Sequence, residues 1–187
     1  KGEQFSPDFL KIAPNNRIPA IVDHDPIDKG EPISIFESGA ILHYLANKTG
    51  QFLSSDLRIR TETLQWLYWQ MAGLGPMAGQ NHHFSQYATE KIPYAIDRYR
   101  NETNRLYGVL NKHLEYRVYI AGQYSIADMA CYPWIVSHEK QGQNLEDFPN
   151  LYRWYELIKA RPATIRAYEI AREINPSPTV HDDEARK

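Results

Sequence analysis

The stretch that decides the fold is residues 16–46, NRIPAIVDHDPIDKGEPISIFESGAILHYLA. Residues 18–23 are mainly apolar, include β-branched side chains and are bounded by turn residues, so they predict a strand with a proline near its start. Residues 32–36 predict a second strand, and the polar connection between the two contains a proline and a glycine, as in a hairpin. The apolar run that begins at Ala40 predicts a well-covered helix ending near Gly50.

Residues 1–53 hold too few elements to form a complete domain. Before the strands, Ser6 and Pro7 predict only a short helix. Two strands and one helix cannot close a core, because each face of a sheet needs cover. We therefore expect residues 1–53 to be only part of a larger unit, followed by a polar linker at residues 54–56 that also caps the next helix.

Residues 54–175 predict an all-helical domain. Apolar residues recur at helical spacing from Leu57 to Leu74, where Gly73, Gly75 and Pro76 are expected to disturb the run. A longer stripe over residues 92–114 predicts the clearest helix of the chain. Further helices are predicted to start at a capping box, Ser125-Ile126-Ala127-Asp128, and to cover residues 151–159 and 162–173; residues 176–187 predict a loose polar tail.

Composition excludes several classes of protein. The chain has 187 residues with 21 Lys and Arg against 23 Asp and Glu, a net charge of −2, which argues against a nucleic-acid partner held by a basic surface. No apolar run approaches the roughly 20 residues that span a bilayer, so no membrane partner is expected. The single cysteine, Cys131, excludes an internal disulfide and a multi-cysteine zinc site. We therefore expect a cytoplasmic protein.

Several motifs occur in the order found in one known family. They are Asn16-Arg17-Ile18-Pro19-Ala20-Ile21, Phe36-Glu37-Ser38-Gly39-Ala40-Ile41, the long helices, and Ser125-Ile126-Ala127-Asp128. This order resembles the cytosolic glutathione transferases. Residues 79–84, GQNHHF, and 92–99, IPYAIDRY, look like the nu class, which includes bacterial disulfide-bond oxidoreductases and the transferase-like region of a yeast nitrogen regulator.

The resemblance implies an α/β plus all-α architecture, with a truncated thioredoxin-like domain at residues 1–53 and a helical domain at residues 54–175. In the family, a first strand, a first helix and a second strand precede the position of Lys1. Nu-class proteins keep their thiol-activating Thr and Asn in that segment, so no catalytic residue can be named in this chain.

The implied function is reduction of small disulfides by bound glutathione, which needs no protein cysteine. Three alternatives stay open. They are conjugation or peroxidase activity on small electrophiles with the same thiolate, a non-catalytic interaction or regulatory module, and an inactive fragment. The family also implies a homodimer that meets through the helices at residues 57–77 and 92–114.

Glu37 and Ser38 form a compact pair suited to the γ-glutamyl end of glutathione, which carries an ammonium and a carboxylate. The Glu37 carboxylate can pair with the ammonium, while the Ser38 hydroxyl and the free N–H groups at the start of the next helix can hold the carboxylate. The plainer interpretation is that both residues only cap that helix.

The other expected glutathione contacts rest on the resemblance. Ile18-Pro19 resembles the family's cis-proline turn, which frees the backbone of Ile18 to pair with the cysteinyl part of glutathione; a trans proline at a strand start is the alternative. Gln4 matches a glutamine near the glycyl end and is otherwise an exposed polar residue. Arg98 matches an arginine of the helical domain and is otherwise a surface charge paired with Glu102.

Asn81-His82-His83 could suggest a metal site, but adjacent histidines on a helix point in different directions and no third ligand has a matching spacing. No metal is therefore expected, and Asn81 and His82 are predicted to line the wall of a pocket between the domains. Cys131, in an apolar helix without a neighbouring base, is predicted to be a small buried core residue.

Overall fold

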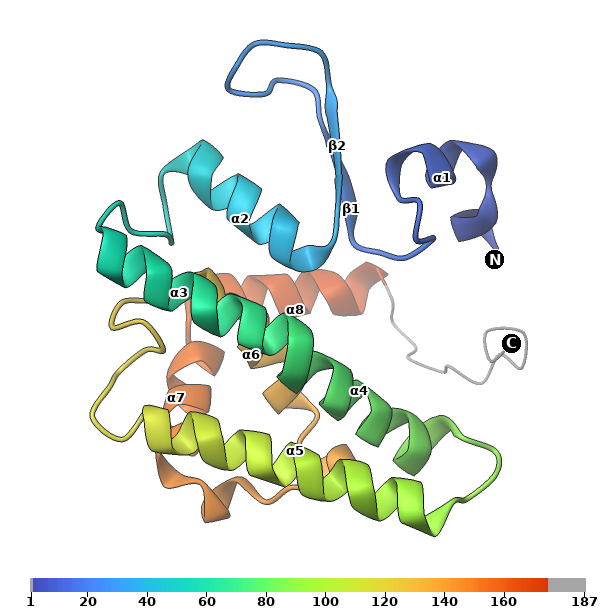
Figure 1. The fold of residues 1–187 in the computed structure, drawn as a ribbon, viewed down its shortest axis with the longest axis vertical. Helices are drawn as coiled ribbons and strands as arrows, with labels where there is room; N and C mark the ends of the chain where they lie inside the picture. Colours follow the sequence, from blue (N-terminus) through green and yellow to red (C-terminus); the bar gives the residue numbers. More distant parts are fainter. Residues whose placement is uncertain (1, 175–187) are drawn as a thin grey trace.

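The structure is a computed structural model that describes residues 2–174. Figure 1 shows a small N-terminal part resting on a larger bundle of helices. The N-terminal part contains the 3₁₀ turn η1 (Glu3–Phe5), α1 (Pro7–Ile12), β1 (Ala20–Asp23), β2 (Ile33–Phe36) and α2 (Ser38–Thr49). The bundle contains α3 (Leu57–Trp69), η2 (Gln70–Leu74), α4 (Gly75–His82), η3 (His83–Tyr87), α5 (Pro93–His113), α6 (Ile126–Val136), η4 (Glu139–Gln141), η5 (Leu145–Asp147), α7 (Pro149–Lys159) and α8 (Pro162–Ile174).

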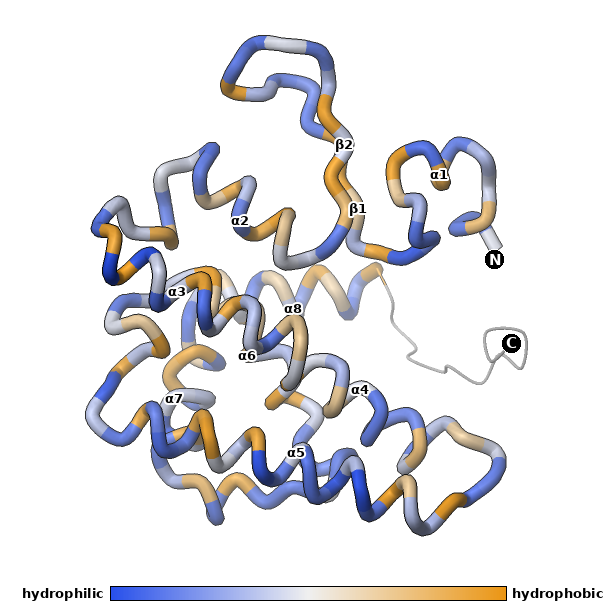
Figure 2. Tube along the Cα trace, viewed as in Figure 1, coloured by the Kyte–Doolittle hydropathy of each residue, from blue (hydrophilic) through white to orange (hydrophobic). Residues whose placement is uncertain are grey.

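The two strands form the predicted antiparallel hairpin, with Ala20 opposite Phe36 and Asp23 opposite Ile33. Figure 2 shows hydrophobic residues along β1 and β2 and a mainly hydrophilic loop between them. α2 follows β2 directly and ends at Gly50, whose φ of 67° suits a glycine better than other residues. This α/β arrangement is the predicted one.

The helical domain surrounds a core that includes the fully buried Tyr107 and Trp154. The predicted capping box is present at the start of α6, because the Asp128 carboxylate accepts the N–H of Ser125 at 2.9 Å and the Ser125 hydroxyl accepts the N–H of Ala127 at 3.3 Å. Asp128 also accepts from the backbone N–H of Ile120 and from Trp154 Nε1. α6 is thereby joined to the loop before it and to α7.

The helix is less disturbed near residues 73–76 than the sequence suggested. α3 and α4 are joined by η2, a π-helical turn in which the N–H of Gly75 bonds to the carbonyl of Gln70. Pro76 lies in the first turn of α4, where a missing N–H costs little. A second π-helical turn, η3, continues the run to Tyr87.

The N-terminal part and the bundle share an apolar cluster. α2 contributes Leu42 and Ala46, α3 contributes Leu67, and α6 contributes Ile126 and Ala130. The N–H of Ile126 also donates to the carbonyl of Phe52 at 3.0 Å. The packing between the two parts therefore fixes where the first turn of α2 lies relative to η2, α4 and α6.

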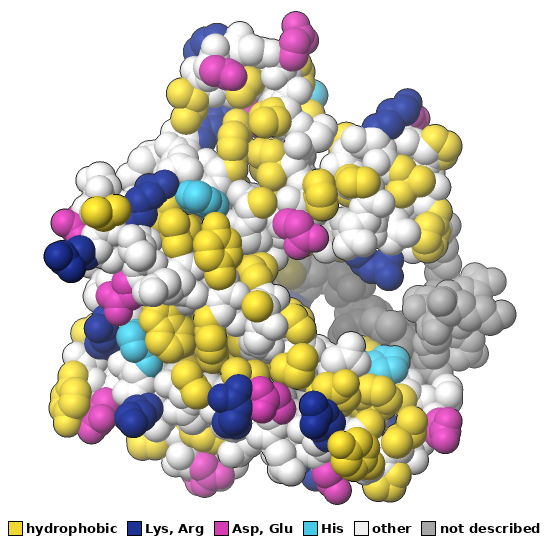
Figure 3. All heavy atoms as spheres, in the orientation of Figure 1, with side chains coloured by type: hydrophobic (Ala, Val, Ile, Leu, Met, Phe, Trp, Pro, Cys, Tyr) yellow, Lys and Arg dark blue, Asp and Glu magenta, His cyan; other side chains and the backbone are white. Residues whose placement is uncertain are grey.

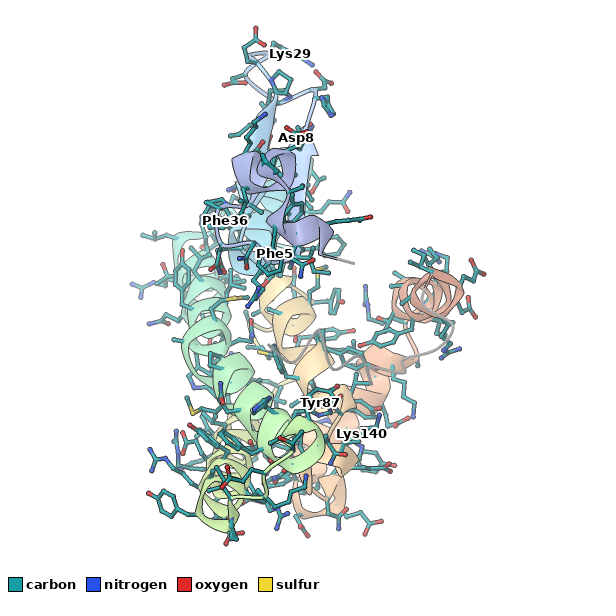
Figure 4. All side chains as sticks on the ribbon, turned by 90° about the vertical axis from the view of Figure 1, so that its right-hand side faces the viewer. Phe5, Asp8, Lys29, Phe36, Tyr87 and Lys140 are labelled. Carbon is teal, nitrogen blue, oxygen red and sulfur yellow. The ribbon has the colours of Figure 1, made fainter. Side chains whose placement is uncertain are left out.

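On the face drawn in Figure 3, basic and acidic side chains are interspersed. In Figure 4 the loop that carries Lys29 projects beyond the rest of the N-terminal part, and α8 lies to one side of the bundle. No helix among residues 2–174 is long and apolar enough to cross a membrane. The predicted tail at residues 176–187 lies outside the described residues.

Candidate functional site

A cleft of about 1050 Å³ lies between the N-terminal part and the bundle. Pro19 and Ser38 contribute to one wall, together with Asn15 and Arg17. The opposite wall is mostly apolar and comes from η2, α4 and α6; it includes Gln70, Met71, Gly75, Pro76, Met129, Pro133 and Trp134. A polar wall facing an apolar one suits a ligand with a charged part and a less polar part.

Ile18 lies between Arg17 and Pro19, which both line this cleft. The Ile18–Pro19 peptide bond is cis, as expected from the resemblance. β1 starts only at Ala20, and the backbone of Ile18 makes no hydrogen bond to any other described residue. Its side chain is also 82% exposed. The N–H and C=O of Ile18 are therefore available to pair with an extended peptide ligand.

Glu37 does not act as a helix cap through its side chain. It occupies the N-cap position of α2, but its carboxylate makes no capping hydrogen bond and is exposed. Its φ of 71° places it in a region that non-glycine residues seldom adopt. The capping interpretation is thus not supported for Glu37, whose carboxylate stays available for a ligand.

The first turn of α2 offers donors for an anion. Its first intrahelical bond runs from the N–H of Ile41 to the carbonyl of Glu37, so the N–H groups of residues 38–40 have no intrahelical partner. Ser38 Oγ lies 3.6 Å from Met71 Sδ. Gly39 packs so closely on Met71 that a Cβ there would lie 3.1–3.2 Å from its side-chain atoms. Met71 thus holds this helix start against η2.

Two predicted contacts lie outside this cleft. Gln4, in η1, is half-buried and is not among the cleft residues. Arg98, on the exposed side of α5, lines a separate groove with Met77 and Tyr94. The expected pairing of Arg98 with Glu102 is replaced by a pair between Glu102 and Arg105 at 2.7 Å, and the hydrogen bond from Arg105 lowers the pKa of Glu102 below its ordinary value.

Asn81 and His82 differ from the predicted pocket wall. Asn81 is fully buried, and its amide donates to Thr103 Oγ1 at 3.1 Å and to the carbonyl of Gln141 at 2.9 Å. His82 Nε2 lies 3.1 Å from the hydroxyl of Tyr87, and burial lowers the pKa of His82 below its ordinary value. Figure 4 shows Tyr87 near Lys140, at the end of the run from α3 to η3. Neither Asn81 nor His82 lines the cleft described above, where their neighbours Gly79 and Gln80 contribute instead.

Cys131 is the buried core residue that the sequence predicts. It is fully buried in α6, and burial raises the pKa of its thiol well above the ordinary value. A protonated, inaccessible thiol is a poor nucleophile. Within residues 2–174, no three His, Cys, Asp or Glu side chains are grouped so as to hold a metal ion.

Sequence reasoning missed Gln70 and Trp134 on the apolar wall. Gln70 follows Trp69 in a stripe of apolar residues. A polar side chain on the face of a helix that otherwise packs in the core could have indicated a functional residue. Trp134 had no comparable signal, because a tryptophan in an apolar helix is ordinarily a core residue.

Comparison with known proteins agrees with this fold. Family models of the glutathione S-transferase N-terminal and C-terminal domains match residues 1–47 and 78–162, respectively. The chain therefore belongs to the glutathione S-transferase family, which confirms the resemblance seen in the sequence.

Among individual relatives, the chain is 60% identical over 168 residues to disulfide-bond oxidoreductase YfcG of Escherichia coli, with 89% of the chain and 78% of YfcG covered. It is 40% identical to disulfide-bond oxidoreductase YghU of the same organism, with 94% of the chain and 62% of YghU covered. A glutathione transferase from Pseudomonas putida, solved with one glutathione disulfide bound per subunit, superposes with a TM-score of 0.83 at 41% identity, covering 90% of the chain and 76% of that protein.

Proposed function

We propose that the protein binds glutathione in the cleft between its two parts and uses the thiol of bound glutathione to reduce small disulfides. The observation that carries this proposal is the set of unused polar groups at one end of the cleft: the backbone of Ile18, the carboxylate of Glu37 and the N–H groups of the first turn of α2. Similarity to YfcG and YghU, both named disulfide-bond oxidoreductases, supports the reaction type.

Each of these groups has a matching part in the tripeptide. Glu37 pairs with the α-ammonium of the γ-glutamyl residue, and Ser38 with the N–H groups of α2 holds its α-carboxylate. The Ile18 backbone pairs with the cysteinyl residue, which holds the sulfur beside the apolar wall. Gln4 and Arg98 remain predicted contacts to the ligand.

The chemistry is supplied by glutathione itself. The bound thiolate attacks one sulfur of the substrate disulfide, a mixed disulfide forms, and the other sulfur leaves as a thiolate that takes up a proton. A second glutathione thiolate then attacks the glutathione sulfur of the mixed disulfide, releasing glutathione disulfide and the second substrate thiol. Cys131 takes no part, because its thiol is buried and protonated.

Conjugation of small electrophiles is the second candidate activity. The apolar wall formed by residues such as Met71, Met129 and Trp134 would suit a hydrophobic electrophile, and the same thiolate would attack it. The disulfide reductase is preferred because both named relatives carry that activity in their names.

We also propose that the protein is a cytoplasmic homodimer. A single buried cysteine suits a reducing compartment. Leu57 and Tyr68 on α3 are 77% and 57% exposed, although both are large and apolar or aromatic. They are eleven residues apart, which places them on the same side of the helix. A second copy of the chain would cover this side.

Glu37→Gln tests the glutathione site, because it removes the charge and keeps the shape. Loss of a charge-assisted hydrogen bond costs about 1.5–3 kcal/mol, so the affinity for reduced glutathione should fall roughly 10- to 150-fold in calorimetric titration. Glu31→Gln, an exposed acid in the hairpin loop, is the matched control and should bind like the original protein. Equal affinities for all three proteins would remove Glu37 from the site.

A further inference from the structure

Gln70 is a buried polar residue without a partner at the apolar wall of the cleft. It is the first residue of the π-helical turn η2, it is 4% exposed, and it lines the cleft. Its Oε1 is buried and has no hydrogen-bond partner among residues 2–174. A buried amide without a partner is uncommon, because it loses its hydrogen bonds to water and gains none in return.

The surroundings of Gln70 keep space for its amide. A Cβ at Gly75 would lie 2.5 Å from Gln70 Nε2 and 3.1 Å from Trp134 Nε1. Only a residue without a side chain leaves both groups where they are. The amide of Gln70 and the indole N–H of Trp134 therefore both lie against Gly75, in the lining of the cleft.

This pair complements a peptide group. The Gln70 carboxamide can accept from an amide N–H and donate to an amide C=O, and Trp134 can donate a second hydrogen bond. The rest of the wall offers side chains such as Met71, Pro76 and Met129, which pack against a ligand without selecting its polar groups. A ligand without a hydrogen-bond donor at this position would leave Oε1 buried and unpaired.

We propose that Gln70, together with Trp134, binds an amide on the leaving half of the disulfide and thereby makes the protein prefer peptide disulfides to amide-free ones. This inference rests on the proposed function, since it assigns the other half of the disulfide to Ile18, Glu37 and Ser38. Gln70 is a specificity-determining residue on the opposite wall and does not activate the thiol.

The test compares two ligands that share the glutathione half. Glutathione disulfide carries amides on its second half, whereas the mixed disulfide of glutathione and ethanethiol carries no polar group there. Calorimetric titration of both ligands is made with the original protein, with Gln70→Met, which is similar in size and apolar, and with Gln51→Met. Gln51 is exposed, lies just after α2 outside the cleft lining and provides the matched control.

The proposal predicts that Gln70→Met weakens binding of glutathione disulfide roughly 3- to 10-fold, as expected for one or two hydrogen bonds, and leaves the mixed disulfide unchanged. Gln51→Met should alter neither affinity. Gln70→Met should also melt at the same temperature as the original protein or up to about 4 °C higher, because a buried unpaired amide is removed. This second measurement excludes unfolding as the cause of weaker binding.

Equal affinities of Gln70→Met and the original protein for glutathione disulfide would overturn the inference, and so would an equal loss for both ligands. Failure of the original protein to bind either ligand is a separate outcome. It would contradict the proposed glutathione site itself, and this inference would fall with it.

Discussion

Asp23, the last residue of β1, joins the hairpin to α2. Its carboxylate accepts hydrogen bonds from Lys48 Nζ at 2.5 Å and from the Tyr44 hydroxyl at 2.7 Å. The hydrogen bond from Lys48, and next the one from Tyr44, lowers the pKa of Asp23 from 3.8 to about 2. The same contact raises the pKa of Tyr44 to about 12. One carboxylate therefore connects the strand to two successive turns of the helix.

This contact predicts an acid-dependent stability. The pKa of Asp23 is lower in the folded protein, so its stabilising effect is complete above about pH 3.8 and is lost as the pH falls toward about 2. Asp23→Asn should lower the urea midpoint at pH 5, and the difference from the original protein should shrink between pH 4 and pH 2. Asp8→Asn, in an exposed ion pair with Lys11, should change the midpoint little at any pH. A difference that stays constant down to pH 2 would contradict the prediction.

Single residues of the site were predicted mainly from the family resemblance. Ile18-Pro19 and Glu37-Ser38 were expected to bind glutathione for that reason, and Pro19 and Ser38 line the cleft. Asn81 was predicted at a pocket wall in place of a metal site, but it is buried and its partners, Thr103 and Gln141, come from positions far along the chain. No local pattern shows which distant group will satisfy a buried amide.

At the scale of elements, α6 depends on contacts made by one side chain. Asp128 is fully buried, and burial raises the pKa of its carboxyl, while bonds from Ile120, Trp154 and Ser125 act in the opposite direction. These donors come from the loop before α6, from the first turn of α6 and from α7. Removing the carboxylate would leave each of them buried without an acceptor.

Substitutions of Ser125 and Asp128 in the capping box should therefore lower the free energy of unfolding by different amounts. Ser125→Ala removes one cap and should lower the free energy of unfolding by about 1 kcal/mol. Asp128→Ala leaves the buried N–H groups of Ile120, Ser125 and Trp154 without an acceptor. It should lower the free energy of unfolding by about 3–5 kcal/mol. Urea denaturation followed by circular dichroism measures both. An equal loss in the free energy of unfolding for the two substitutions would show that the hydrogen bonds from Ile120 and Trp154 do not contribute measurably to stability.

Most helices and strands could be predicted, because hydrophobic periodicity and capping residues can be recognised within a short stretch of sequence. The hairpin follows from two short apolar runs around a polar loop, and α5 and α6 follow from their stripe and capping box. The π-helical turns could not be predicted, since glycine and proline at residues 73–76 indicate a break as readily as a wide turn. The sequence pattern does not decide between a break and a wide turn at these residues. Tertiary packing decides it: Met71 packs against Gly39, and Gln70 and Trp134 pack around Gly75.

For the whole molecule, the exposed side of α3 should control assembly. Tyr68 is 57% exposed on α3, and Tyr116, just beyond α5, is 90% exposed. Tyr68→Asp should weaken the homodimer at least about 30-fold, because a charge in the centre of an apolar interface costs about 2 kcal/mol or more. Tyr116→Asp is the same substitution on a more exposed tyrosine and should leave the dimer intact. Sedimentation velocity distinguishes the two, and a monomeric original protein would contradict the proposed assembly.

The uninterrupted helical run from α3 to η3 limits how this chain can change. Each π-helical turn holds one residue more than an α-helical turn would. Deleting one residue from 70–74 would turn η2 into an ordinary α-helical turn, and α4 would keep nearly the same faces, because the wide turn takes up the extra residue. The turn itself would change, and it carries the cleft residues Gln70 and Met71. An alignment gap at residues 70–74 of a related sequence would therefore signal a protein with a different apolar wall.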